Sequence, residues 1–177
     1  VMPGLVDAHV HINEPGRTDW EGFETATKAA AAGGITTLVD MPLNCIPVTT
    51  TVNALQEKTV STREKLWIDC GFYGGLIPDN LKDIEPLAEA GVLGFKAFMS
   101  HSGIDEFPKV AESHLRKALS ILVNKAIPVL VHAELENSVE TSNSHQTYES
   151  FQATRPKSWE NNAIKLLIKL CREYETH

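Results

Sequence analysis

Two histidines separated by one residue, His9 and His11, follow an apolar stretch near the start of the sequence. If that stretch is a β-strand, both side chains lie on the same face of it, because alternate residues of a strand point the same way. Two neutral imidazoles on one face are typical ligands of zinc or another transition metal. The pair alone fits better with two histidines that only form hydrogen bonds or lie at a surface, so other residues must decide.

Lys96 is unusual because it lies inside the apolar run 94–99. An unpaired ammonium is costly to bury, and burial lowers the pKa of a lysine, which leaves a neutral amine that can act as a nucleophile. Such an amine can add carbon dioxide and become a carbamate, an anion whose two oxygens can bridge two metal ions. Taken alone, Lys96 is better interpreted as an ammonium paired with a buried carboxylate such as Asp40.

His132 ends another very apolar run, 129–132. A single histidine in that position is more often hydrogen-bonded in the core than bound to a metal. Taken together, however, His9, His11, Lys96 and His132 all lie at the carboxyl ends of expected parallel strands, where the sites of barrel enzymes are built. The four residues therefore form one candidate metal site.

The elements that must position these residues alternate between short apolar runs and longer amphipathic stretches, which is typical of successive βα units. Strands are expected at 4–11, 35–41, 67–76, 94–99 and 128–134, and helices at 18–32, 50–64, 81–90, 111–125 and 159–174. The count of five units fits either an open doubly wound sheet or part of an eight-stranded barrel. Counting strands alone leaves both architectures open.

Several local details follow from residue types. Thr18 or Asp19 is expected to cap the first helix, and Gly33 with Gly34 to end it. Residues 136–155 are polar and are expected to be irregular. Apolar residues are expected to form the buried stripe of the last helix, namely Ile164, Leu167, Ile168 and Cys171, and the inner face of the sheet, namely Val10, Val39, Phe95 and Val131.

Composition excludes several classes of function. The sequence has 177 residues with 16 Lys and Arg against 23 Asp and Glu, a net charge of −7, which argues against nucleic acid or an anionic membrane as the partner. No apolar run approaches the roughly 18 residues of a membrane span. The three cysteines form no CxxC pair, which favours a reducing, intracellular location. The first residue is Val1, so we expect the sequence to be part of a longer chain.

Five short motifs resemble the cyclic amidase branch of the amidohydrolase superfamily, which includes dihydroorotases, hydantoinases and allantoinases. They are Pro-Gly-Leu-Val-Asp-Ala-His-Val-His at 3–11, Gly-Gly-Ile-Thr-Thr at 33–37, Met-Pro-Leu-Asn at 41–44, Gly-Phe-Lys at 94–96 and Val-His-Ala-Glu at 131–134. They occur in the order and spacing of the family. The resemblance implies an α/β fold, a TIM-type (β/α)₈ barrel of the metal-dependent hydrolase kind, with residues 1–177 forming about its first five βα units.

The resemblance also implies a role for each candidate ligand. His9 and His11 are expected to bind the first of two divalent metal ions, taken to be zinc, His132 the second, and carboxylated Lys96 to bridge them. A further metal-binding histidine and the catalytic aspartate are expected beyond His177, and His177 itself is interpreted as the lead-in to the next strand. The remaining strands and a small β domain are absent, so residues 1–177 alone are expected to be inactive, and the whole protein to be a homotetramer.

Within this branch, residues 11–25 are most similar to allantoinases. Dihydroorotases usually carry an arginine where this sequence has Asn13, because their substrate presents a carboxylate. Asn13 and Asn44 are expected to contact a small cyclic ureide. The expected reaction is the metal-dependent opening of allantoin to allantoate in purine breakdown. The alternatives are a hydantoinase or dihydropyrimidinase, and a non-catalytic scaffold that kept the barrel.

Overall fold

The computed structural model describes residues 1–136 and 147–176. In this part of the chain six strands form two sheets, ordered β1–β2–β3 and β4–β5–β6, and every neighbouring pair is parallel. The strands are β1 (Leu5–Val10), β2 (Ile35–Asp40), β3 (Asp69–Phe72), β4 (Gly74–Gly75), β5 (Phe95–Phe98) and β6 (Val129–His132). All of them lie inside the ranges expected from the sequence.

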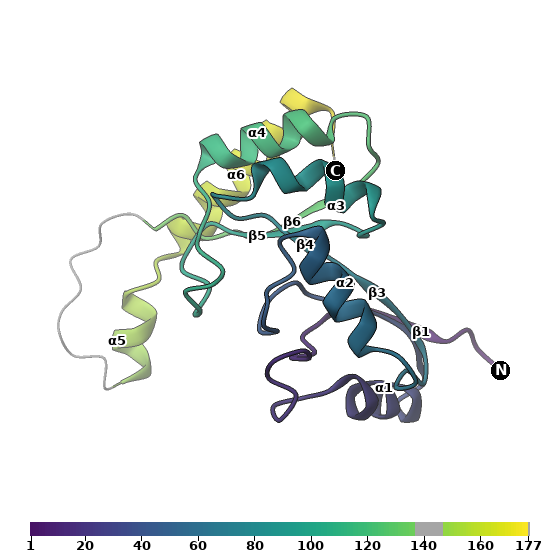
Figure 1. Cartoon of the computed structure of the whole chain (residues 1–177). Helices are drawn as coiled ribbons and strands as arrows, with labels where there is room; N and C mark the ends of the chain where they lie inside the picture. Colours follow the sequence, from purple (N-terminus) through teal and green to yellow (C-terminus); the bar gives the residue numbers. More distant parts are fainter. Residues whose placement is uncertain (137–146, 177) are drawn as a thin grey trace.

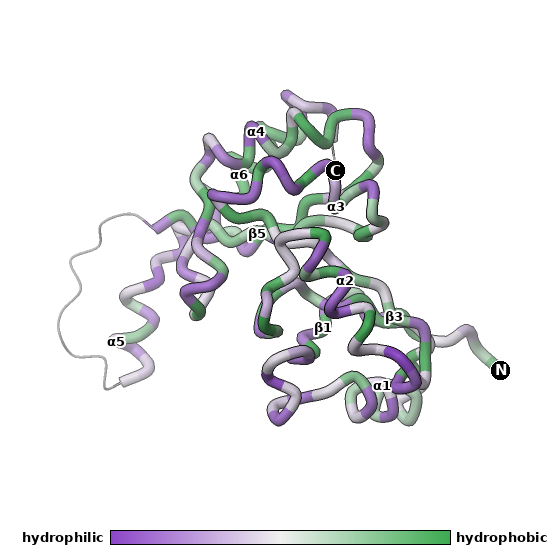
Figure 2. Tube along the Cα trace, viewed as in Figure 1, coloured by the Kyte–Doolittle hydropathy of each residue, from purple (hydrophilic) through white to green (hydrophobic). Residues whose placement is uncertain are grey.

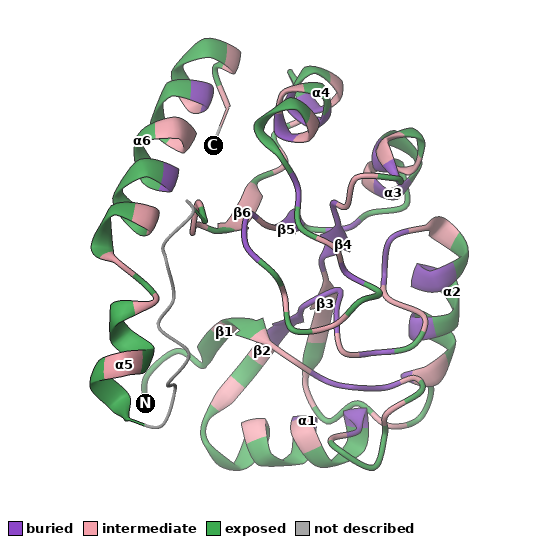
Figure 3. Cartoon of the chain, turned by 90° about the vertical axis from the view of Figure 1, so that its left-hand side faces the viewer, coloured by how far each residue is buried: buried purple, intermediate pink, exposed green. Residues whose placement is uncertain are grey.

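β3 and β4 are two parts of one extended stretch, expected as a single strand at 67–76. Only Tyr73 separates them, and its N–H donates to the carbonyl of Asp40 at 3.0 Å. The N–H of Gly74 donates instead to the carbonyl of Gly94, at 2.9 Å. The stretch therefore leaves β2 and joins β5, and the two sheets follow one another around a single arc of strands (Figure 3).

Helices connect successive strands along the outer side of this arc, and two more in the described part of the chain follow the last strand (Figures 1 and 3). They are α1 (Phe23–Ala32), α2 (Val52–Ser61), the 3₁₀ turn η1 (Leu81–Asp83) with α3 (Ile84–Glu89), α4 (Glu112–Leu122), α5 (Tyr148–Ala153) and α6 (Lys157–Tyr174). Parallel strands joined by helices confirm the α/β class and the five βα units. In Figure 3 the arc is open between β1 and β6.

The main hydrophobic core lies between the strands and the helices. Phe95 and Ala97 of β5 pack with Leu87 of α3 and with Leu115 and Leu119 of α4. Figure 2 shows the corresponding pattern, with hydrophobic residues along β5 and alternating hydropathy along α4. The core therefore packs one face of β5 against the helical layer, and the other face of the strand points to the inner side of the arc.

The expected inner face is wrong at three of its four positions. Phe95 and Val131 pack in the core beside α3 and α4, and Val10 packs with Phe23 of α1. Only Val39 belongs to a different cluster, with Met41 and Tyr73. The physical reason is strand alternation: if His9 and His11 share one face, Val10 must point to the other.

The first helix begins later than expected. It starts at Phe23 with Gly22 as its N-cap, so neither Thr18 nor Asp19 caps it. The carboxylate of Glu14 accepts a hydrogen bond from the N–H of Phe23 at 2.9 Å, a contact nine residues distant in sequence. The expected end is confirmed, because Gly33 is the C-cap and Gly34 follows with a φ of 85°.

The C-terminal part differs from expectation in two ways. Helix α5 falls within the stretch expected to be irregular, and Thr147 caps it by accepting from the N–H of Ser150 at 3.2 Å; residues 137–146 and His177 lie outside the described residues. In α6 the fully buried residues are Ala163 and Leu170.

The expected stripe of α6 is therefore rotated. Leu167 packs against the core, as expected, but Ile164 and Ile168 are 41% and 46% exposed. Residues 163, 167, 170 and 174 have the spacing of one helical face, and they face α4 and β6. The apolar residues alone did not identify which of two adjacent faces packs.

Two expectations from composition concern the cysteines and membranes. Cys45, Cys70 and Cys171 are free thiols. Within residues 1–136 and 147–176, no helix combines the length and the apolar character needed to cross a lipid bilayer.

The buried side chain of Asn80 provides a test of the fold. Its amide donates to the carbonyls of Thr50 and Gly75 at 2.9 and 2.8 Å and accepts from the N–H of Ile77 at 3.0 Å. Asn80→Ala should lower the free energy of unfolding by about 2–4 kcal/mol, because three buried polar groups lose their partner. Chemical denaturation measures the change. Exposed Asn161→Ala is the control, and an equal effect of both variants would contradict the prediction.

Candidate metal centre

His9 and His11 lie together at the carboxyl end of β1, with ring centroids 5.5 Å apart. His9 is exposed and His11 is half-buried. The Nδ1 atom of His11 is buried and makes no hydrogen bond to any described residue. Burial lowers the pKa of His11, and the nearby positive charges of His9, Lys96 and Lys58 lower it further, against an opposing effect of the Leu43 carbonyl. The imidazole is therefore neutral near pH 7, which is the form that binds metals.

Lys96 extends from β5 and is 5% exposed. Its Nζ lies 4.9 Å from the ring centroid of Phe98, and no carboxylate within the described residues pairs with it. Burial lowers the pKa of Lys96. This lysine consequently favours the neutral amine far more than an exposed lysine does.

The alternative pairing of Lys96 with Asp40 is wrong. Asp40 pairs with Lys58 of α2, whose Nζ lies 2.6 Å from Oδ2. Asp40 shares its face of β2 with Leu38, which packs against Phe23 of α1, so the carboxylate is directed toward the helical layer. Lys96 lies on the face of β5 opposite to the core residue Phe95, so the two side chains belong to different sides of the strands.

His132 lies beside Phe98 at the end of β6. The two residues are register partners on neighbouring strands, and their rings stack with centroids 5.1 Å apart and an interplanar angle of 15°. The Nε2 atom of His132 is 3.5 Å from the carboxylate of Glu134, which also accepts from Arg155 at 2.7 Å. Lys96, Phe98 and His132 thus form one continuous row across β5 and β6.

The structure therefore places the four expected ligands in two groups, His9 with His11 and Lys96 with His132. The two groups influence each other electrostatically, because the positive charge of Lys96 lowers the pKa of His11. Among the residues described, no three His, Cys, Asp or Glu side chains converge into a metal-binding group. A centre at this end of the strands depends on Lys96 as an additional ligand.

The two expected substrate contacts, Asn13 and Asn44, lie on loops that follow β1 and β2. Asn13 is 8% exposed, and its Oδ1 is buried without a hydrogen-bond partner among the described residues. Asn44 has a left-handed φ of 73°. Its carbonyl accepts from Nη1 of Arg17 at 2.8 Å, and Nη2 of Arg17 reaches the carboxylate of Glu106 at 3.3 Å. Arg17 therefore joins three loops at the site end of the strands.

Sequence reasoning missed Arg17 and Lys58. Lys58 was expected on an ordinary amphipathic helix, yet its side chain is 0% exposed. Its spacing from the buried residues Ala54 and Leu55 places it on the buried face of α2. The sequence signal was a lysine on the apolar face of a helix. Such a lysine indicates a buried carboxylate partner, which here is Asp40.

Comparisons with known proteins identify the family of this chain. Residues 1–171 match the model of the Amidohydrolase family. The chain belongs to the amidohydrolase family. It is 48% identical to the allantoinase of Saccharomyces cerevisiae, over 97% of this chain and 38% of that protein. It is 51% identical to the allantoinase of Streptomyces avermitilis, over 95% of this chain and 38% of that protein.

The solved structures agree with this family. The L-hydantoinase (dihydropyrimidinase) from Arthrobacter aurescens superposes with a TM-score of 0.91 at 32% identity, over 99% of this chain and 40% of that chain. The expected partial barrel of the amidohydrolase kind is therefore confirmed as the fold. The chain spans less than two fifths of the length of each of these two allantoinases.

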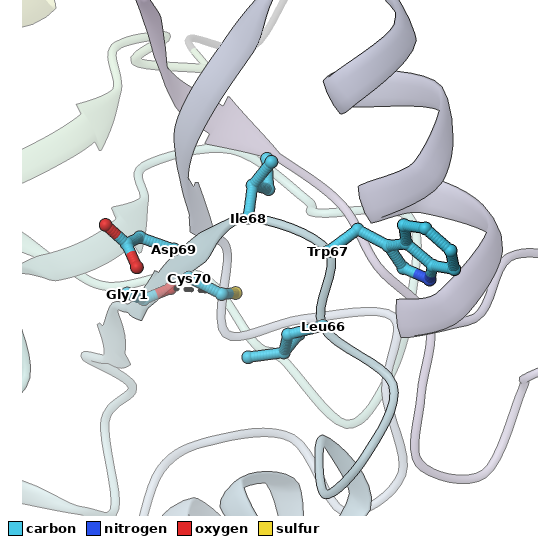
Figure 4. A pocket seen from close by; sticks show the side chains of 6 residues that line it. All are labelled: Leu66, Trp67, Ile68, Asp69, Cys70 and Gly71. Carbon is cyan, nitrogen blue, oxygen red and sulfur yellow. Dashed lines mark hydrogen bonds between the residues drawn. The ribbon is translucent and has the colours of Figure 1, made fainter.

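A surface depression at the other end of the strands does not belong to this centre. It is lined by Leu66, Trp67 and the residues that lead into and begin β3, up to Gly71 (Figure 4). The candidate ligands of this amidohydrolase chain follow the carboxyl ends of strands, whereas the depression lies at an amino end. The Cys70 thiol there is directed to the Gly71 carbonyl at 3.7 Å and faces no other titratable side chain of the depression within hydrogen-bonding distance.

Substitution of the two buried lysines of this amidohydrolase chain should change the free energy of unfolding in opposite directions. In metal-free protein, Lys96→Met should raise the free energy of unfolding by about 1–3 kcal/mol, because an unpaired ammonium is replaced by an apolar group of similar length. Lys58→Met should lower it by about 3–5 kcal/mol, because the carboxylate of Asp40 loses its partner. Urea denaturation at pH 7 measures both. Equal destabilisation by the two substitutions would show that Lys96 has a stabilising partner.

Proposed function

We propose that this chain is the metal-binding part of an allantoinase, which hydrolyses the cyclic amide of allantoin to allantoate. The observation that carries the proposal is a buried lysine without a carboxylate partner among the described residues, in a row with one histidine at the same end of the strands as a histidine pair. The identities of 48% and 51% to allantoinases favour this substrate. On this proposal the partner is a small cyclic ureide.

The residues present fit two divalent metal ions, with zinc as the proposed metal. The unpartnered Nδ1 of His11 and its lowered pKa suit a neutral imidazole ligand. His9 and His11 would hold one ion, His132 the other, and the carbamate of Lys96 would supply an oxygen to each. When bound, the ions would activate water and polarise the amide carbonyl.

The burial of Lys96 favours its carboxylation. A neutral amine adds to the carbon of carbon dioxide and releases one proton, which leaves an anionic carbamate. The low exposure of Lys96 lowers its pKa and so favours the amine form relative to an exposed lysine. The flat ring of Phe98 supports both Lys96 and His132 and limits the directions in which the lysine stem can extend.

Asn13 and Asn44 would bind the ureide through neutral hydrogen bonds. The free Oδ1 of Asn13 is an acceptor suited to an N–H group of the substrate. Arg17 would hold the backbone of Asn44 in place while Glu106 neutralises its charge. A ureide without a carboxylate needs no cationic partner at position 13.

We propose that residues 1–177 are the N-terminal part of one barrel domain, completed by further strands and a small β domain. The share of the relatives' length that the chain spans supports this arrangement. The general base, a further aspartate, and the remaining metal-binding histidine would then lie beyond His177. In this arrangement residues 1–177 have no amidase activity alone, and the whole protein is an intracellular homotetramer.

A hydantoinase or dihydropyrimidinase is the second candidate. The superposition on the Arthrobacter aurescens L-hydantoinase favours it, since the TM-score is 0.91. The sequence identity of 32% to that enzyme is nevertheless lower than the identity to the allantoinases. A scaffold without catalysis is less consistent with four filled ligand positions.

Carboxylation of Lys96 is tested by substitution in the full-length protein. Lys96→Ala should abolish allantoin hydrolysis and lower the metal content, because the bridging anion is lost. Acetate or propionate should restore part of both by supplying a carboxylate in the space left. Lys96→Arg should not be rescued, since a guanidinium forms no carbamate. Full turnover and metal content in Lys96→Ala would refute the ligand assignment.

Asn13 is expected to set the preference between substrates. The full-length enzyme should hydrolyse allantoin at a higher kcat/KM than dihydroorotate by about 30- to 1000-fold, since a missing charge-assisted contact costs on the order of 2–4 kcal/mol. Asn13→Arg should narrow the ratio, and Asn53→Arg on α2 is a control for added charge. Comparable kcat/KM values for both rings would exclude the allantoinase assignment, and a preference for dihydrouracil would favour the second candidate.

A further inference from the structure

The side chain of Asp40 continues the hydrogen-bond ladder between β1 and β2 beyond the ends of the strands. The last backbone contact is from the N–H of Met41 to the carbonyl of Val10, at 2.7 Å. Two residues past the end of β1, the N–H of Ile12 donates to Oδ1 of Asp40 at 2.6 Å. Ile12 directly follows His11. The carboxylate therefore fixes the backbone beside His11 at the point where the two strands separate.

Lys58 holds this carboxylate from the helical layer. The side chains of Asp40 and Lys58 are both 0% exposed, and Nζ lies 2.6 Å from Oδ2. The same Nζ donates to the carbonyl of Met41 at 3.0 Å. Each carboxylate oxygen thus has its own donor, one from the backbone of Ile12 after β1 and one from α2, and the rotation of the carboxylate is restricted.

The charges of the pair persist near neutral pH. Burial raises the pKa of Asp40 to about 6, against the effects of Lys58 and of the N–H groups of Ile12 and Met41. Burial alone would lower the pKa of Lys58, but Asp40 and Cys45 together raise it above its ordinary value. At pH 7 and above the contact is therefore an ion pair with a charge-assisted bond to the N–H of Ile12.

We propose that Asp40 is a positioning residue that orients His11 as a metal ligand through the backbone of Ile12, while Lys58 compensates the buried charge of Asp40. Metal-binding histidines are usually oriented by a hydrogen bond from their second ring nitrogen. The Nδ1 of His11 makes none to a described residue, and Ile12 is itself 0% exposed and packed beside Phe23. The anchor at Ile12 thus holds the backbone beside His11 in addition to the effect of the Leu43 carbonyl on the ring. This inference rests on the proposed role of His11.

Two double variants of the full-length protein separate the anchor from the charges. In Asp40→Asn with Lys58→Met both charges are removed, but the Asn oxygen still accepts from the N–H of Ile12. In Asp40→Leu with Lys58→Met the acceptor is lost as well. The affinity for Co²⁺ alone, measured by competition with a chelator and by the visible absorption of the bound ion, should fall 10- to 100-fold in the Leu variant. The Asn variant should stay within about threefold of the parent protein, because the anchor remains.

Controls distinguish positioning from general destabilisation. Asn80→Ala loses buried hydrogen bonds in the turn between β4 and η1, away from His11, and should leave Co²⁺ affinity unchanged. If the Leu variant binds Co²⁺ as tightly as Asn80→Ala does, the inference is wrong. If the Leu variant does not fold, Asp40→Ala with Lys58→Met removes the same acceptor with less bulk and gives the same comparison.

His11→Ala separates this inference from the function on which it rests. If His11→Ala weakens Co²⁺ binding and the Leu or Ala variant does not, only the positioning role fails. If His11→Ala binds Co²⁺ like the parent protein, His11 is not a ligand, and both the proposed centre and the positioning role are overturned.

Discussion

A strand presents alternate residues to opposite faces, and the candidate centre depends on this constraint. Phe95 and Ala97 are held by the helical layer, which forces Lys96 and Phe98 to the other face of β5. Val10 packs against Phe23 in the same way and leaves His9 and His11 on the opposite side of β1. The hydrophobic core therefore determines on which face of each strand these polar residues lie.

The two buried lysines show how the same side chain acquires different chemistry. Lys58 has a carboxylate at 2.6 Å and stays an ammonium that stabilises the junction of β1, β2 and α2. Lys96 has an aromatic ring and no carboxylate among the described residues, and burial lowers its pKa. A buried charge is costly without a partner, so the lysine without one is the lysine whose pKa is lowered.

The sequence predicted the elements and the strand-end residues because both depend on local patterns. The ranges of the strands and the Gly33 end of α1 follow from periodicity and backbone preference. The start of α1 was wrong because Glu14, nine residues before Phe23, satisfies the first turn. The pairing of Asp40 with Lys58, and the exposure of Ile164 and Ile168 on α6, likewise depend on contacts between elements that no local pattern contains.

The arrangement of the strands gives the proposed centre a structural consequence. One group of ligands follows β1 in the first sheet, and the other follows β5 and β6 in the second. Within the described residues, backbone hydrogen bonds link these sheets around the stretch from β3 to β4. Metal ions held by both groups would connect the sheets a second time, across the inner side of the arc. Because a ligand that binds only the folded state stabilises it, the centre would then contribute to the closure of the barrel as well as to its chemistry.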